Sequence, residues 1–187
     1  DAILLFVTNP VDVITYRAFI KTGWPRNRVF GQAGVLDSSR MASFIAMETG
    51  FSSMDINTMV LGGHGDTMVP MLRYCTIAGI PVEQFIVKDR LDAIVERTRN
   101  GGAEILKLRQ NSSAYDAPAA SVAEMVDAIV HNRNRILPTV CLLEGEYGHE
   151  DIAIGVPAML GQNGVIDIIE LDMNEAEQAM FDNSAAL

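Results

Sequence analysis

The chain has 187 residues, of which 49% are hydrophobic and 20% charged, proportions typical of a globular protein with a buried core. Its 24 acidic and 14 basic residues give a formal net charge of −10, which argues against binding to nucleic-acid phosphates or to an anionic membrane surface. No run approaches the roughly 20 apolar residues of a membrane span. Cys75 and Cys141 are typical of reduced thiols in a cytoplasmic protein, and with three histidines they offer no metal-ligand spacing, so we expect no metal site.

The first segment is an unbroken apolar run, residues 2–7, followed by the polar Thr8-Asn9-Pro10. Such a run predicts a strand buried on both faces, as in a parallel sheet. A strand of that kind requires neighbouring βα units, and none precedes it. We therefore expect the chain to begin inside a sheet and to be part of a longer protein.

Apolar periodicity and turn residues predict the elements that follow. The first half is expected to contain a helix to residue 20, a strand at 28–31, a turn at 32–34, a helix at 37–49, and strands at 56–61 and 69–77. The second half is expected to contain helices at 89–110 and 118–130, strands at 136–143 and 152–160, and a last helix that begins at a capping box of Asn174 and Glu177. Gly101-Gly102 is a weak point in the first of these helices. The chain reaches Leu187 without a helix cap, so we expect truncation there too.

Three polar clusters directly follow or flank the predicted strands, where α/β folds place ligands. Asn9 can donate its amide to a substrate oxygen, and its bond to Pro10 can adopt the cis form. Asp37 and Arg40 are three residues apart and share a helix face, so the guanidinium fork can present itself to a carboxylate. His64 lies between glycines and can exchange a proton near neutral pH, with Asp37 preferred over the adjacent Asp66 as its orienting acid.

Each cluster also has a purely structural interpretation. Asn9 can cap a strand before a turn, Asp37 and Arg40 can form a surface ion pair, and His64 can be a packed structural histidine. Together, however, the residues can bind a carboxylate, exchange a proton and orient an oxygen. No serine or cysteine lies in a nucleophile elbow, so hydrolysis has less support.

Three segments in this order resemble the lactate/malate dehydrogenase family: VTNPVD at 7–12, GQAGVLDSSR at 31–40 and GGHGDTMVP at 62–70. The likeness continues through residues 94–102, 113–120 and 155–157, and so covers essentially the whole chain. Within the family it is greatest to the lactate-dehydrogenase-like malate dehydrogenases of bacteria. The glycine before His64 favours malate, since lactate dehydrogenases more often have a glutamate there.

The resemblance implies reversible NAD-dependent oxidation of (S)-malate to oxaloacetate, a reaction of the tricarboxylic acid cycle. His64 resembles the proton acceptor and donor, and Asp37 the acid that orients it and stabilises the imidazolium. Arg40 resembles the bidentate clamp on the substrate carboxylate, and Asn9 the residue that touches the reacting oxygen. Val7, Thr8 and Asn9 would line the nicotinamide end of the cofactor site.

The expected fold is α/β: residues 1–12 as the end of a Rossmann parallel sheet, then residues 13–187 as an α+β catalytic domain with antiparallel strands and long helices. Exposed strand edges and apolar helix faces point to a homodimer or homotetramer. Two alternatives stay open. The substrate can be lactate or another 2-hydroxy acid, or the chain can be a non-catalytic oligomerisation fragment.

The sequence also departs from the family pattern. It contains neither the glycine-rich turn that holds the cofactor pyrophosphate nor the mobile loop that brings further arginines to the substrate. We therefore expect these 187 residues by themselves to bind NAD poorly and to turn over slowly or not at all. Asp116 stands near the expected substrate wall, where relatives often have an aromatic or apolar residue, and the sequence offers no account of it.

Overall fold

The structure is a computed structural model that describes residues 2–110 and 114–186. The helices in these ranges are α1 (Val11–Thr22), α2 (Gly34–Thr49), α3 (Lys88–Arg109), α4 (Asp116–Val130) and α5 (Glu175–Ala185). The predictions made for Asp1, Ser113 and Leu187 lie outside the described residues.

Two sheets are formed by the described strands. The larger has seven strands in the order β1-β2-β8-β9-β4-β5, with β10 paired to β9. Its members are β1 (Leu4–Phe6), β2 (Val29–Gln32), β4 (Val60–Gly62), β5 (Met68–Pro70), β8 (Arg135–Glu144), β9 (Glu150–Gly161) and β10 (Gly164–Ile168). The smaller sheet is antiparallel and contains β3 (Ile56–Asn57), β6 (Thr76–Ile77) and β7 (Ile80–Pro81).

Within the described residues, β1 and β2 are parallel and the other pairings of the large sheet are antiparallel. The mixed α/β fold with antiparallel strands and long helices is thus confirmed. The parallel pair extends to Gly31, whereas the domain boundary expected after residue 12 stays a prediction.

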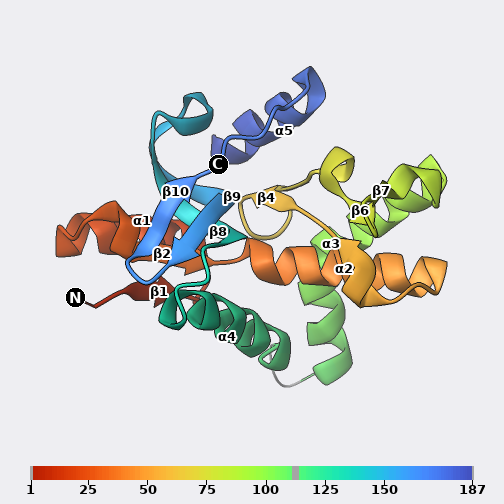
Figure 1. The fold of residues 1–187 in the computed structure, drawn as a ribbon, viewed down its shortest axis with the longest axis horizontal. Coiled ribbons are helices and arrows are strands. Elements are labelled where there is room, and N and C mark those ends of the chain that lie inside the picture. The colour runs from red at the N-terminus through yellow and green to blue at the C-terminus, as the bar shows by residue number, and fades with distance from the viewer. Residues whose placement is uncertain (1, 111–113, 187) are drawn as a thin grey trace.

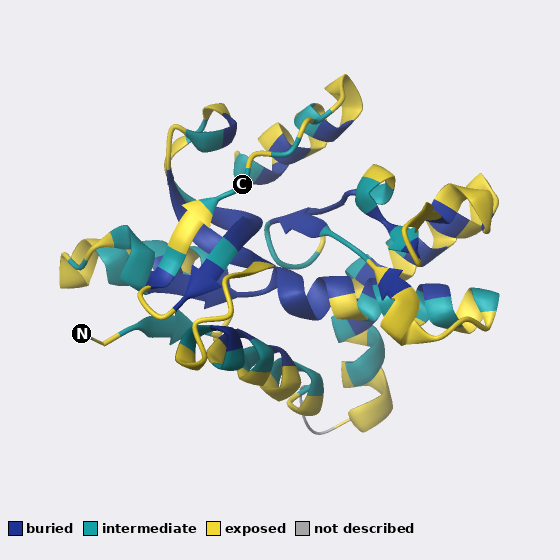
Figure 2. Ribbon diagram, in the orientation of Figure 1, coloured by how far each residue is buried: buried dark blue, intermediate teal, exposed yellow. Residues whose placement is uncertain are grey.

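The helices cover the sheet on several sides (Figure 1). In that view α4 lies below the central strands, where it packs on β9, and α5 lies above them, where it packs on β4 and β5. Helix α1 packs on β2, β8 and β9. Helix α2 packs on α3, β4 and β8. Buried residues concentrate in the central strands and on the inner helix faces (Figure 2).

Local sequence accounts for the helix ends. Helix α1 follows Pro10 and stops at Gly23, whose left-handed conformation lets its N–H donate to the carbonyl of Phe19. Helix α5 begins with the predicted capping box, in which Asn174 and Glu177 each accept the other's backbone N–H.

Gly34 opens α2 at a close approach between the helix and the sheet. A Cβ at this position would lie 2.4 Å from Cβ of Pro138 in β8 and 2.9 Å from the carbonyl oxygen of Val60 in β4. Glycine therefore lets the first turn of α2, which carries Asp37, press against both strands.

Several sequence expectations for this region were wrong. Gln32 ends β2 and Gly34 starts α2, so residues 32–34 form no separate turn. The strand expected at 56–61 divides into β3 and β4, which belong to different sheets. The division occurs at Thr58, whose hydroxyl donates to the carbonyl oxygen of Ser38 in α2 (2.7 Å).

The strand expected at 69–77 is also divided. Residues Leu72–Tyr74 form a 3-10 turn, closed by a bond from the N–H of Cys75 to the carbonyl of Leu72 (2.9 Å). The chain passes through this turn from β5 in the large sheet to β6 in the small one. A pattern of apolar residues carries no mark of such a change of sheet.

Three further differences concern strands β1 and β10 and helix α3. Strand β1 is half-buried, because in the described chain it pairs with β2 alone. Strand β10 was not expected from sequence. Gly101-Gly102 does not interrupt α3, which is continuous from Lys88 to Arg109.

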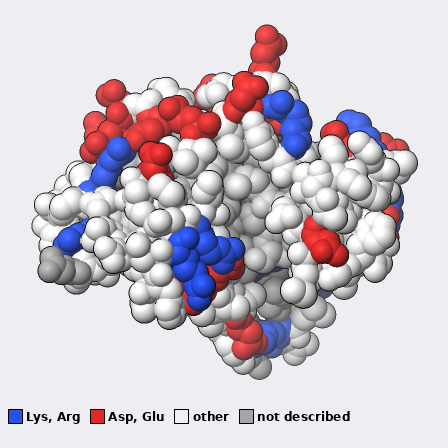
Figure 3. All heavy atoms as spheres, viewed as in Figure 1, with Lys and Arg blue, Asp and Glu red and all other residues white. Residues whose placement is uncertain are grey.

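The surface reflects the net charge. Acidic side chains gather along the upper edge of the face in Figure 3, the edge where α5 lies in Figure 1. None of the helices in residues 2–110 and 114–186 is both long and apolar enough to span a bilayer.

Candidate functional site

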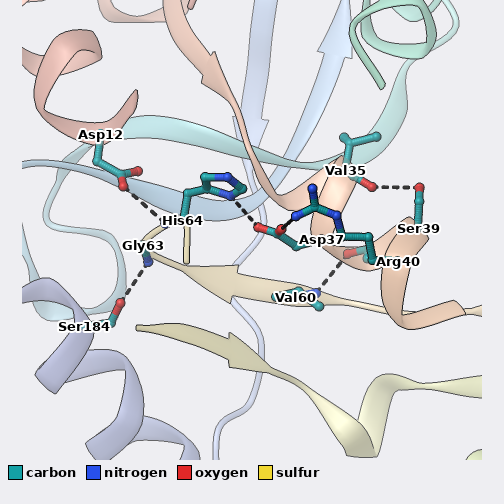
Figure 4. A network of polar contacts seen from close by, with 10 residues as sticks. Asp12, Val35, Asp37, Ser39, Arg40, Val60, Gly63, His64 and Ser184 are labelled. Carbon is teal, nitrogen blue, oxygen red and sulfur yellow. Dashed lines mark hydrogen bonds and ion pairs between the residues drawn. The ribbon is translucent and has the colours of Figure 1, made fainter. Parts of the chain in front are cut away.

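His64 lies in the loop between β4 and β5 and contacts the predicted acid. Its Nδ1 is 2.8 Å from Oδ2 of Asp37, in the first turn of α2 (Figure 4). The side chain of Asp37 is 2% exposed and that of His64 19% exposed. Asp66, the alternative acid, is exposed. The geometry thus pairs the histidine with an acid 27 residues away rather than with its neighbour.

Arg40 joins the same carboxylate from the next turn of α2. Its Nη1 is 3.4 Å from Oδ1 of Asp37, and its side chain is 12% exposed. Among the described residues the buried Nε of Arg40 has no hydrogen-bond partner. The guanidinium therefore retains donors for an added anion, and a planar carboxylate matches its fork.

Helix α3 leaves room for this arginine. A Cβ at Gly101 would lie 3.2 Å from Cδ of Arg40, closer than most side-chain contacts. The glycines that the sequence marked as a weak point of the helix therefore border the Arg40 side chain. The pair of glycines inside an expected helix was the available signal, but the sequence did not show that they face Arg40.

The electrostatics of the site favour a protonated imidazole. The hydrogen bond to Asp37 raises the pKa of His64 above its ordinary value of 6.5, against the opposing effects of burial and of Arg40. With Nδ1 held by Asp37, Nε2 is the ring nitrogen left to exchange a proton. The same division of the two ring nitrogens is used by catalytic histidines paired with carboxylates.

Two hydrogen bonds accepted by Ser38 hold α2 against the start of β4. Its hydroxyl accepts from the N–H of Val60 at 3.1 Å, and its carbonyl oxygen accepts from the Thr58 hydroxyl. These bonds fix the start of β4, and therefore the approach to His64, relative to the helix that carries Asp37 and Arg40.

Asp12 has no role predicted from the sequence, yet its side chain contacts the loop between β4 and β5 that carries His64, called the histidine loop below. The N–H of His64 donates to Oδ2 of Asp12 at 3.3 Å, and the adjacent N–H of Gly63 donates to the Ser184 hydroxyl at 2.8 Å (Figure 4). Burial raises the pKa of Asp12 above its ordinary value of 3.8. Its position two residues after Pro10, at a helix start, was the available signal, although an acid there is also typical of an ordinary helix N-terminus.

Val7, Thr8 and Asn9 are exposed at the carboxyl end of β1. In the described part of the chain, Asn9 makes no hydrogen bond to His64, Asp37 or Arg40. The Asn9–Pro10 peptide bond is cis and leads directly into α1. The structure thus brings together the acid, arginine and histidine, while the role of Asn9 stays a prediction.

Asp116 is the first residue of α4 and is largely exposed. Its Oδ2 lies 2.5 Å from Nη2 of Arg109 at the end of α3. Asp116 therefore forms an ion pair that joins α4 to α3. This contact is a structural role for the acid that departs from the family pattern.

The described residues contain no group of three or more His, Cys, Asp or Glu side chains arranged to hold a metal ion. What they do contain is an acid-base pair next to an arginine with open donors, on an antiparallel α/β domain. These features define a site that can bind a carboxylate and move a proton.

Comparison with known proteins agrees with this description. The model of the lactate/malate dehydrogenase alpha/beta C-terminal domain matches residues 34–187. The chain is 68% identical over 186 residues to the malate dehydrogenase of Thioalkalivibrio sulfidiphilus, covering 100% of the chain and 61% of that protein. It is 61% identical over 184 residues to the malate dehydrogenase of Nitrosococcus oceani, covering 98% and 59%.

Solved structures give the same result. The malate dehydrogenase of Salinibacter ruber superposes with a TM-score of 0.97 at 48% identity, over 100% of this chain and 61% of that one. The malate dehydrogenase of Aeropyrum pernix also has a TM-score of 0.97, at 42% identity, over 100% and 62%. The chain belongs to the lactate/malate dehydrogenase family. It spans about three fifths of the length of the curated relatives named here.

Proposed function

We propose that this chain is the substrate-binding part of an NAD-dependent malate dehydrogenase, which oxidises (S)-malate to oxaloacetate and catalyses the reverse reaction. The observation that carries the proposal is the contact of His64, Asp37 and Arg40 in one cluster. The names of the relatives support malate as the substrate.

Each of the three side chains has a distinct part in the mechanism. Arg40 binds a carboxylate of the substrate through its guanidinium fork and thereby fixes the C2 oxygen relative to His64. During oxidation the neutral imidazole takes the proton of the C2 hydroxyl at Nε2, and during reduction the protonated ring returns it. Asp37 holds Nδ1–H and stabilises the imidazolium that forms, while Asn9 would donate its amide to the reacting oxygen.

The residues present fit one end of an NAD molecule. Val7, Thr8 and Asn9 are exposed at the carboxyl end of a strand in a parallel pair, which is where open α/β sheets bind nucleotides. These residues would line the nicotinamide end, and the nicotinamide supplies the acceptor or donor for the hydride. The glycine-rich pyrophosphate turn is not part of these 187 residues.

We also propose a cytoplasmic homodimer or homotetramer. Large apolar side chains stand exposed at the end of α2 and beyond it, including Met47, Met54 and Val87. Self-association would bury such side chains. Two buried free thiols suit a reducing compartment. Sedimentation velocity of the intact protein should give a dimer or tetramer, and a monomer at micromolar concentration would contradict the proposed assembly.

The function is tested by NADH oxidation in the purified protein that contains this chain, with oxaloacetate and pyruvate as alternative substrates. Much faster turnover with oxaloacetate is expected, and replacement of His64 by Asn should lower it by orders of magnitude in a variant that still folds. Faster turnover with pyruvate would instead make the protein a lactate dehydrogenase. No turnover with either, in a protein that binds NADH, would make this chain a non-catalytic module.

A further inference from the structure

The backbone of the histidine loop is held by side chains from two helices. The N–H of His64 donates to Asp12 in α1, and the N–H of Gly63 donates to Ser184 in α5. These two helices lie at opposite ends of the sequence and approach the loop from different sides (Figure 4). The ring of His64 points away from both, toward Asp37.

The two acceptors, Asp12 and Ser184, differ in their effect on the stability of the fold. Ser184 is a neutral hydroxyl, whereas Asp12 is a carboxyl group of which one oxygen, Oδ1, is buried and has no hydrogen-bond partner among the described residues. A buried acid without a full set of partners is unfavourable. A serine or an asparagine could accept the same N–H without carrying a charge. The acid at this position therefore calls for a role in addition to that hydrogen bond.

The charged groups around the imidazole identify that role. Helix α2 presents Asp37 and Arg40, and the negative and positive charges of this pair oppose each other at the ring. Helix α1 adds Asp12, and α5 presents the uncharged Ser184. Asp151 of β9 borders the same cavity of about 310 Å³ as Asp12, and Asp66 of the loop itself is exposed.

We propose that Asp12 is a positioning residue for His64: it fixes the loop peptide so that the ring keeps its contact with Asp37, and it places a second carboxylate next to the histidine. The consequence for catalysis rests on the proposed function of His64, whereas the effect on the ring itself does not. Asp12 acts through the histidine and does not need to touch the substrate.

The test uses the intact protein that contains this chain and separates charge from packing. Asp12→Asn keeps an acceptor for the His64 N–H and removes the charge, and Asp12→Ala removes both. Ser184→Ala loosens the neighbouring amide without changing any charge. Asp66→Asn is the matched control, because it removes an exposed carboxylate from the same loop.

Two readouts are needed. The first is an NMR titration of the histidine ring signals, with the signal of His64 assigned by its loss in His64→Gln. The second is the pH profile of kcat/KM for oxaloacetate reduction, which requires the protonated ring and therefore falls as pH rises through the pKa of His64.

Asp12→Asn is expected to lower the pKa of His64, so kcat/KM for oxaloacetate should begin to fall at lower pH. The plateau value of kcat/KM at low pH should be nearly unchanged. Asp12→Ala should in addition lower the plateau by about tenfold, because the His64 N–H loses its partner. Ser184→Ala should lower the plateau without moving the pKa, and Asp66→Asn should change neither quantity.

An unchanged pKa of His64 in Asp12→Asn would overturn the inference. An equal pKa shift in Ser184→Ala would also overturn it, because the effect would then come from loop packing and not from charge. If Asp12→Ala fails to fold, the isosteric Asp12→Asn still decides the question. If the intact protein lacks dehydrogenase activity yet Asp12→Asn lowers the pKa, the proposed function fails while the positioning role stands.

Discussion

Replacement of Asp37 by Asn is the perturbation for which the structure allows the most specific expectation. The side chain is 2% exposed, and its Oδ2 lies 2.8 Å from Nδ1 of His64. An asparagine of nearly the same shape can still accept the Nδ1–H bond. What the variant loses is the negative charge beside the ring.

The size of the effect follows from that difference. A hydrogen bond to a charged group contributes about 1.5–3 kcal/mol and a neutral one about 0.5–1.5 kcal/mol. The loss is therefore on the order of 1–2 kcal/mol of imidazolium stabilisation, which is about 5- to 30-fold in rate. Solvent screening does little to reduce this figure, because the carboxylate is buried.

The direction with pH can be worked out from the same contact. Asp37 raises the pKa of His64, so reduction of oxaloacetate, which needs the protonated ring, persists to higher pH than it would with an unpaired histidine. In Asp37→Asn the fall in kcat/KM should begin at lower pH. At pH values where His64 is protonated in both the wild-type protein and the variant, the difference in kcat/KM between the two should narrow.

The assay is NADH oxidation by the intact protein over about pH 5 to 9, the range in which histidines titrate. Asp66→Asn serves as the control, and thermal unfolding shows whether the variant is folded. A loss of the same size at every pH would refute the electrostatic role of Asp37, and so would no loss at all.

The remaining predictions concern the arginine, two close contacts of glycine, and the stability of the fold. Arg40→Lys loses the planar fork and should lower kcat/KM for oxaloacetate by about 10- to 150-fold, which corresponds to the loss of one charged hydrogen bond. The unfolding midpoint should not change, and unaltered kinetics would show that Arg40 does not bind the substrate. Gly101→Ala should stabilise α3 by about 0.5–1 kcal/mol but raise KM, because the new Cβ would lie 3.2 Å from Cδ of Arg40. An unchanged KM would show that the Arg40 side chain can move aside without affecting substrate binding. Gly34→Ala should cost about 1–3 kcal/mol and lower the unfolding midpoint by about 2–12 °C, because its Cβ would meet strand atoms; an unshifted midpoint in calorimetry would contradict the close approach. Because the pKa of His64 is raised in the folded protein above 6.5, its stabilising contribution should be complete below pH 6.5 and disappear as pH rises through the folded value, and His64→Gln should flatten this dependence in denaturant titrations.

The sequence was informative wherever a local rule governs the structure. The helix that starts at Asn174 and Glu177 follows from side chains that cap their own backbone, and the structure contains that capping box. The contact of Asp37 with Arg40 follows from helical spacing in the same way. Such features depend on residues within one or two turns, so one segment contains all the information needed.

The sequence was less informative where partners lie far apart. The run at 56–61 has the composition of one strand, but it divides because Thr58 bonds to α2 and the two halves join different sheets. Strand β10, which the sequence did not predict, pairs antiparallel with β9. Strand pairing is decided by neighbours that local periodicity does not specify.

The candidate site divides along the same line. The sequence by itself identified His64, Asp37 and Arg40, because each lies in a motif whose residue types suit proton exchange or carboxylate binding. The tertiary structure alone decided that Asp37 rather than Asp66 reaches the ring, that Gly101 borders Arg40, and that Asp12 holds the histidine loop. The physical reason is that these contacts join segments 27 or more residues apart, and their distances are set by how α1, α2 and α3 pack around the sheet.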